Sequence, residues 1–127
     1  MYKLLFGICL LHLVHDVICG NLRIGFFDEP KELIFNEVHA SNAKFLRASE
    51  LVTVTAPKGR KIIAIVVEDE AFGKNGIVKV ANGGVGATFV TIYIAGPVLQ
   101  GYRFLIEVYA TVKYRNTKTA PGNQNAI

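Results

Sequence analysis

The stretch YRFLIEVYATVKYR, residues 102–115, decides the fold class of this chain. Its side chains alternate along the whole stretch: Phe104, Ile106 and Val108 fall on one face, while Arg103 and its i+2 neighbours fall on the other. A period of two residues is typical of a β-strand that buries one face and exposes the other. The stretch therefore predicts one long antiparallel strand.

Further strands are predicted before this stretch. The chain is rich in turn residues, and isoleucine and valine each outnumber leucine after residue 20. β-Branched side chains favour extended backbone. The predicted strands are Thr88–Ala95, Ile62–Val67 (apolar on both faces, hence central), Glu50–Ala56, Glu32–Val38 and Ile77–Ala81. We expect Gly96–Gly101 to join Thr88–Ala95 to the long strand as a hairpin loop. The pattern predicts an all-β fold, a single antiparallel β-sandwich or flattened barrel of about six to eight short strands.

The first twenty residues differ in kind from the rest of the 127-residue chain, which is 51% hydrophobic overall. An apolar run from Leu4 to Val14 follows one early lysine and ends at polar residues, as in a secretory signal peptide. A membrane-spanning helix needs roughly 17–25 apolar residues, more than this run provides. We expect cleavage after Cys19 or Gly20, then a β-sandwich domain over residues 21–116 and a flexible tail over 117–127. No membrane span is expected in the mature chain.

Both cysteines, Cys9 and Cys19, lie in the predicted signal peptide. The mature domain would therefore lack a disulfide framework and would depend on its hydrophobic core.

Three segments carry residues suited to chemistry, and each has a structural interpretation that we prefer. His39 and Ser41 suggest a nucleophile and base, but no third group is evident, so we expect a polar turn. The acidic run Glu68–Glu70 lacks the spacing of a calcium loop and reads as a solvated hairpin turn. The glycines in Asn82–Gly86 precede a strand, whereas a phosphate cradle precedes a helix, so we expect a glycine-rich turn, with or without a bulge. No catalytic, cofactor or metal site is expected.

The net charge of +4 raises the question of nucleic-acid binding. Lys113, Arg115 and Lys118 cluster near the end of the long strand, but Tyr109 and Tyr114 lie on opposite faces of it. Nucleic-acid binders carry denser basic stripes. We expect an ordinary solvated basic surface and no direct contact with nucleic acid.

The C-terminal half resembles the arthropod transcription-activator family named for multiprotein bridging factor two, in particular its secreted, salivary-type members. The family motif has a double-glycine turn, a Val-Thr strand, a loop, and a strand ending in aliphatic-Glu-aliphatic-Tyr. The matching residues, which the resemblance marks as structural, are Gly83, Gly84, Gly86, Val90, Thr91, Gly101, Phe104, Glu107 and Tyr109.

Weaker likeness extends over most of residues 32–110. The basic-aromatic patch Lys44–Arg47, the strand at Val52–Val54, the central strand at Ile62–Ile65 and the acidic turn at Asp69–Gly76 contribute to it. Two positions depart from the family pattern. Ala95–Leu99 replaces a polar or basic loop, and Ala110 replaces the glycine after the final tyrosine.

The resemblance implies a transcriptional co-activator that bridges a DNA-bound factor to the general transcription machinery, although many members look like small secreted proteins. We predict a small, secreted, extracellular, non-enzymatic arthropod protein that binds an unknown protein or small ligand. The alternative is the nuclear co-activator. A third hypothesis, a secreted hydrolase, would use Glu68, Asp69 or Glu107.

Overall fold

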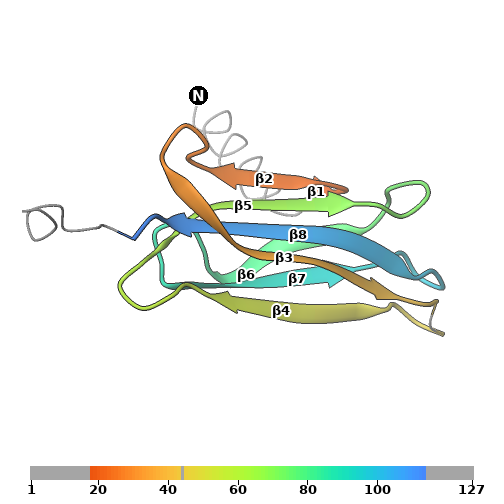
Figure 1. Cartoon of the computed structure of the whole chain (residues 1–127). Helices are drawn as coiled ribbons and strands as arrows, with labels where there is room; N and C mark the ends of the chain where they lie inside the picture. Colours follow the sequence, from red (N-terminus) through yellow and green to blue (C-terminus); the bar gives the residue numbers. More distant parts are fainter. Residues whose placement is uncertain (1–17, 44, 114–127) are drawn as a thin grey trace, which may run out of the picture.

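β-Branched and alternating segments form eight strands in a computed structural model of the chain, which describes residues 18–43 and 45–113 (Figure 1). Sheet A contains, in spatial order, β1 (Ile18–Cys19), β6 (Ile77–Gly83), β7 (Phe89–Ala95) and β4 (Ser49–Thr55). Sheet B contains β2 (Leu22–Gly25), β5 (Ile62–Asp69), β8 (Tyr102–Thr111) and β3 (Lys31–Ser41). Every strand pair is antiparallel, so the predicted all-β fold is confirmed.

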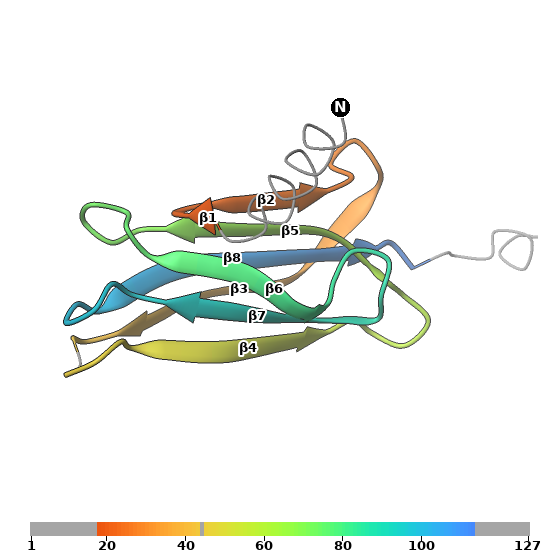
Figure 2. The same ribbon diagram turned by 180° about the vertical axis from the view of Figure 1, so that it is seen from behind.

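The two sheets lie face to face and do not join into a barrel, which leaves the sandwich as the correct one of the two predicted architectures. Sheet B faces the viewer in Figure 1, and sheet A faces the viewer in Figure 2. The core fills the space between them. Its largest fully buried side chains are Phe104, Ile62, Ile65, Ile92, Ile94, Ile106, Val67, Val78, Val90 and Val108.

The strand β8 has the alternating burial that its sequence predicts. Tyr102, Phe104, Ile106 and Val108 are buried, while Arg103 and the residues between the others point to the outer face of sheet B. The strand ends at Thr111, before the predicted end at residue 115. Val112 and Lys113 lie outside the strand, and residues 114–115 lie outside the described residues.

The hairpin predicted at Gly96–Gly101 is wrong, because β7 and β8 lie in different sheets. The loop carries the chain across the core instead. Ile92 of β7 and Ile106 of β8 are both fully buried, and facing strands can bury such side chains against one another. An alternating pattern indicates which face of a strand is buried. It does not indicate whether the next strand pairs with that strand in the same sheet or packs against it from the other sheet.

The hairpin predicted at Glu68–Glu70 is wrong for the same reason, because β5 and β6 also lie in different sheets. Asp69 is not solvated but buried, with 2% of its surface exposed. Its carboxylate accepts backbone N–H bonds from Ala71 at 2.9 Å and from Gly76 at 2.8 Å, which satisfies the buried charge and fixes the crossing loop.

The other predicted strands are present, with no bound shifted by more than three residues. The central position of β5, between β2 and β8, agrees with its apolar character. The glycine-rich turn after β6 is present and follows a bulge between Val80 and Asn82. Sequence patterning missed β2, which is short. β1 falls inside the predicted signal peptide, and residues 1–17 and the predicted tail lie outside the described residues.

Candidate binding surface

The motif residues are distributed over the fold and do not gather into one site. Gly83 is the last residue of β6, and Gly84 and Gly86 lie in the turn that follows it. A Cβ at Gly83 would collide with the carbonyl of Phe89. Gly101 precedes β8, where a Cβ would collide with the carbonyl oxygen of Ser41. Gly83 and Gly101 therefore allow close backbone approaches.

The remaining motif residues belong to both sheets. Val90 and Phe104 are core residues. Thr91 lies on the outer face of sheet A, where its hydroxyl is 2.9 Å from that of Thr53. Glu107 and Tyr109 lie on the outer face of sheet B.

The residues weighed for chemistry do not combine either. The polar turn predicted at His39 and Ser41 is wrong, because both residues belong to β3, which continues past the predicted strand end at Val38. Ser41 donates its hydroxyl to the carbonyl of Asn42 at 3.3 Å and makes no hydrogen bond to His39 in the described part of the chain. Asp69 faces the core, whereas Glu68 and Glu107 pair with outward positions of neighbouring strands, so the three hydrolase candidates do not converge. No group of three metal-ligating side chains gathers within residues 18–43 and 45–113.

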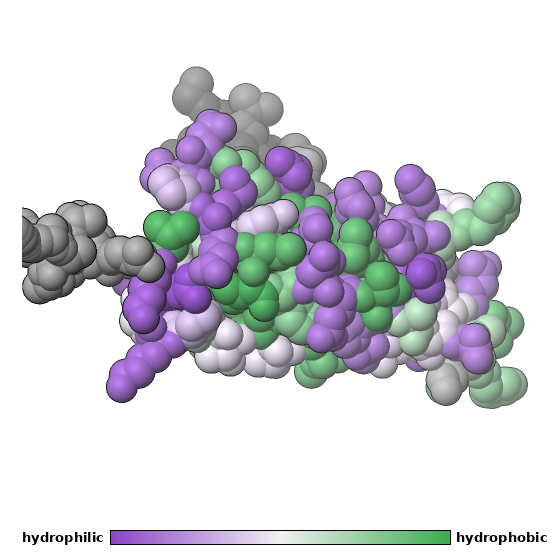
Figure 3. Space-filling model, in the orientation of Figure 1, coloured by the Kyte–Doolittle hydropathy of each residue, from purple (hydrophilic) through white to green (hydrophobic). Residues whose placement is uncertain are grey.

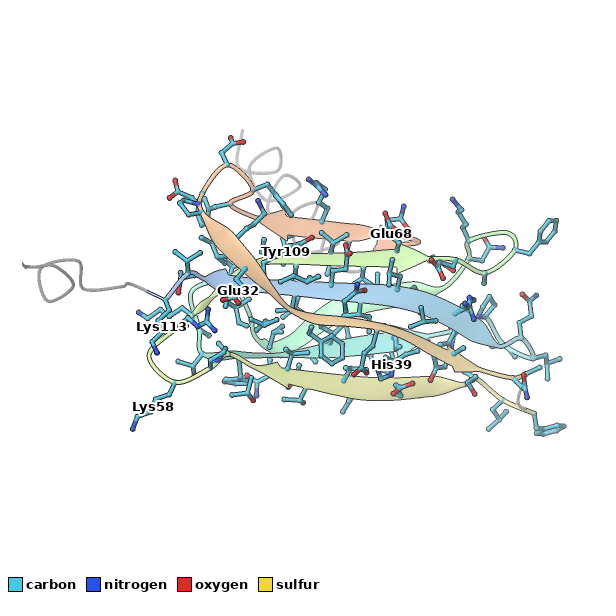
Figure 4. The ribbon with its side chains drawn as sticks, in the orientation of Figure 1. Glu32, His39, Lys58, Glu68, Tyr109 and Lys113 are labelled. Atoms are coloured by element: carbon cyan, nitrogen blue, oxygen red, sulfur yellow. The ribbon has the colours of Figure 1, made fainter. Side chains whose placement is uncertain are left out.

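A polar cluster that sequence reasoning missed links the two sheets at their open edge. His39 on β3 is 2.9 Å from Glu50 on β4 through Nδ1 and 3.1 Å from Glu37 through Nε2. The hydroxyl of Tyr102 on β8 donates to the other oxygen of Glu50 at 2.5 Å. Figure 4 shows His39 between the edge strands β3 and β4.

Electrostatics favour the charged form of Glu50 in this cluster. Burial by itself would raise the pKa of Glu50, but hydrogen bonds from Tyr102 and His39 and the charge of His39 outweigh it and lower that pKa. Burial, and then the hydrogen bond to Glu50, raise the pKa of Tyr102 well above its usual value. The cluster holds the two sheets together, because Glu50 of sheet A contacts both His39 and Tyr102 of sheet B, and we call it the inter-sheet clamp.

Three loops lie at one end of the sandwich, and we call their described residues, 42–43, 45–48, 70–76 and 96–101, the loop end. The register pairs Ser41 with Tyr102, Asp69 with Phe104, and Ile77 with Ala95, which places all three connections together (Figure 1). Two of the loops are tied directly. Leu99 donates its backbone N–H to Leu46 at 3.1 Å, and the guanidinium of Arg47 donates to the carbonyl of Gly96 at 2.8 Å.

Large hydrophobic side chains at the loop end point into solvent. Phe45 is 87% exposed, Phe72 is fully exposed, and Leu46, Val98 and Leu99 are each more than half exposed. Figure 3 shows green, hydrophobic surface at this end, level with the β5–β6 and β3–β4 connections. Exposed apolar patches on a protein surface mark contact sites for other proteins or for membranes.

The sequence contained a signal for part of this surface, because Phe45 and Leu46 fall in the basic-aromatic patch Lys44–Arg47, and Val98 and Leu99 fall in the apolar segment Ala95–Leu99. Phe72 falls in the acidic turn Asp69–Gly76. Each segment alone looked like ordinary loop. Only the strand order, with its register, places these segments at the same end of the fold.

Within the described part of the chain, no helix is long and apolar enough to cross a membrane. The predicted basic cluster is described only at Lys113, which Figure 4 shows at the end opposite the loop end, near Lys58.

Comparison with known proteins gives one match. A model of the family described as "Transcription activator MBF2" matches residues 25–110. This range runs from the last residue of β2 almost to the end of β8. No curated protein and no solved structure matches the chain.

Proposed function

Because the chain belongs to the family of the transcription activator MBF2, we propose that it works by binding another molecule, as a small exported protein without enzymatic activity. The observation that carries this proposal is the loop end. Burying one large apolar side chain contributes about 1.5–3 kcal/mol, so several exposed side chains on one surface represent substantial unused binding energy.

Export is supported by the apolar N-terminal segment and by the local structure at its end. β1 pairs with β6 through two residues only, and Gly20 donates one backbone hydrogen bond to Gly76. Cleavage after Cys19 or Gly20 would remove β1 and leave the rest of the sandwich. Asn21 would stay, and its side-chain oxygen accepts the backbone N–H of Asp69 at 2.9 Å.

Expression of the full chain with a C-terminal tag tests export. The protein is expected outside the cells, in the medium or held at the cell surface, with Gly20 or Asn21 as its first residue. Retention in the nucleus with residues 1–20 intact would overturn this part of the proposal.

Retention of the exported protein at the surface of the producing cells tests the binding surface. The double variant Phe72→Ser/Leu99→Asn should lose retention. Phe26→Ser is the matched control, because Phe26 is 61% exposed but lies in the loop between β2 and β3 at the opposite end. Equal retention of all three proteins would contradict a binding role for the loop end.

The family description favours one second candidate, a co-activator that bridges a DNA-bound factor to the general transcription machinery. In that role the loop end would contact a transcription factor in the nucleus. A reporter assay with the full chain tests it: activation that is lost in Phe72→Ser/Leu99→Asn would support it, and absence of both activation and transcription-factor binding would remove it.

A further inference from the structure

The shape of the loop end points to the kind of partner it fits. A backbone hydrogen bond from Lys74 to Ala71 closes one turn, and a bond from Gln100 to Pro97 closes another. Phe72 is at the first central position of the first turn, and Val98 and Leu99 are the two central residues of the second. The central positions of a turn project furthest from the strands. The hydrophobic side chains thus protrude from the molecule. Protruding side chains can insert into a lipid interface, which deforms around them.

The backbone at these turns is held in a conformation that their side chains disfavour. Leu99 has a φ of +66° and Lys74 a φ of +52°, and they are the non-glycine residues with positive φ in the described part of the chain. Glycine or asparagine would suit both positions better. Strain of this kind concentrates at functional sites, and here it coincides with an exposed apolar side chain and an exposed cation.

The charge of the loop end is one-sided. Among the described residues, its loops contain the cations Arg47 and Lys74 and one acidic residue, Glu70. Glu70 is already engaged, 3.2 Å from Arg103 at the base of the loop. At the opposite end, the loop that carries exposed Phe26 also contains the acidic residues Asp28 and Glu29. Exposed hydrophobic residues are therefore combined with positive charge at the loop end and with negative charge in the loop of Phe26.

Protruding apolar side chains beside the two exposed cations Arg47 and Lys74 match the interface of an anionic lipid bilayer, where apolar groups enter the headgroup boundary and each nearby Lys or Arg adds attraction. We propose that the loop end docks the protein on an anionic membrane surface. Phe45, Leu46, Phe72, Val98 and Leu99 enter the interface, and Lys74 and Arg47 face the headgroups. This inference rests on the proposed function, for which it names the partner.

Co-sedimentation with lipid vesicles tests the inference, using protein purified from the medium of cells that express the full chain. The vesicles contain phosphatidylcholine alone or mixed with phosphatidylserine. We expect the protein to sediment with the mixed vesicles, to bind phosphatidylcholine vesicles less, and to be released as salt rises. No sedimentation with the mixed vesicles would overturn the inference.

Two matched pairs of variants locate the contact. Phe72→Ser/Leu99→Asn should lower the partition coefficient by about tenfold or more, because large apolar side chains no longer leave water. Phe26→Ser should bind like the native protein. Lys74→Gln should reduce binding to the mixed vesicles only, and Lys58→Gln, exposed at the opposite end, should not. Equal effects at both ends would contradict docking through the loop end.

Circular dichroism melting of each variant separates lost binding from lost folding. The vesicle and cell-surface experiments together separate the proposed binding function from the proposed lipid partner. Cell retention that depends on the loop end, without vesicle binding, would indicate a protein partner and refute the lipid surface while the binding function stands. If the native protein shows neither cell retention nor vesicle binding, the binding function is refuted too.

Discussion

Leu99 donates its backbone N–H to the carbonyl oxygen of Leu46 at 3.1 Å, which joins the β7–β8 loop to the β3–β4 loop. This bond makes one surface out of side chains that are far apart in sequence. It also lets a positive φ at Leu99 persist, because the loop is anchored to its neighbour on one side and to the turn from Pro97 on the other.

Leu99→Asn should leave the stability of the protein unchanged or raise it by up to about 1 kcal/mol. Asparagine tolerates positive φ better than leucine, and the Leu99 side chain is largely exposed, so little burial is lost. Urea unfolding measures the change. A loss of several kcal/mol would mean that the leucine side chain supports the fold.

Tyr102→Phe should lower the free energy of unfolding by about 1 kcal/mol, the typical net value of one hydrogen bond. The substitution removes the bond from the Tyr102 hydroxyl to Glu50 across the two sheets and leaves the ring in the core. Chemical denaturation tests this value. An unchanged midpoint would show that the bond does not contribute to holding the sheets together.

The stabilising contribution of Glu50 should depend on pH in the acid range. Its pKa is lower in the folded protein than its ordinary value of 4.5, so the folded state favours the carboxylate. The contribution is fully present above pH 4.5 and declines as the pH falls through the lower, folded-state pKa. Melting curves of the native protein and Glu50→Gln should therefore converge on acidification. A constant difference down to strongly acidic pH would contradict the coupling.

Two glycines of the same turn should respond differently to alanine. Gly83→Ala combines a positive φ with a collision against the carbonyl of Phe89, so we expect a loss above about 2 kcal/mol. Gly86→Ala meets open space at a φ of +92° and should cost only about 1 kcal/mol. Thermal unfolding compares the two variants, and equal losses would show that the close approach at Gly83 does not matter.

The fold class could be predicted from sequence because the alternation along Tyr102–Thr111 directly reflects which side chains are buried. The pairing of strands could not. The loops at 70–76 and 96–101 contain the glycines and short lengths of hairpins, yet both cross between the sheets. Their course depends on which buried faces meet, and that is a property of the assembled core.

The candidate surface and the inter-sheet clamp were hidden for a related reason. Asp69 looked like part of a solvated acidic run, but its carboxylate serves two backbone N–H groups of a loop that the sequence pattern did not place. His39 and Glu50 belong to edge strands of different sheets, and their contact follows from the strand order. Phe45, Phe72 and Leu99 likewise lie at one end of the sandwich only because three crossings share that end.

Amide resonances of the ¹⁵N-labelled exported protein, recorded with and without vesicles of phosphatidylcholine and phosphatidylserine, test the central claim most directly. The account predicts that vesicles broaden or shift the signals of Phe45, Leu46, Phe72 and Leu99 and leave Phe26 unaffected. Changes confined to the outer faces of the sheets, with the loop end unchanged, would contradict it.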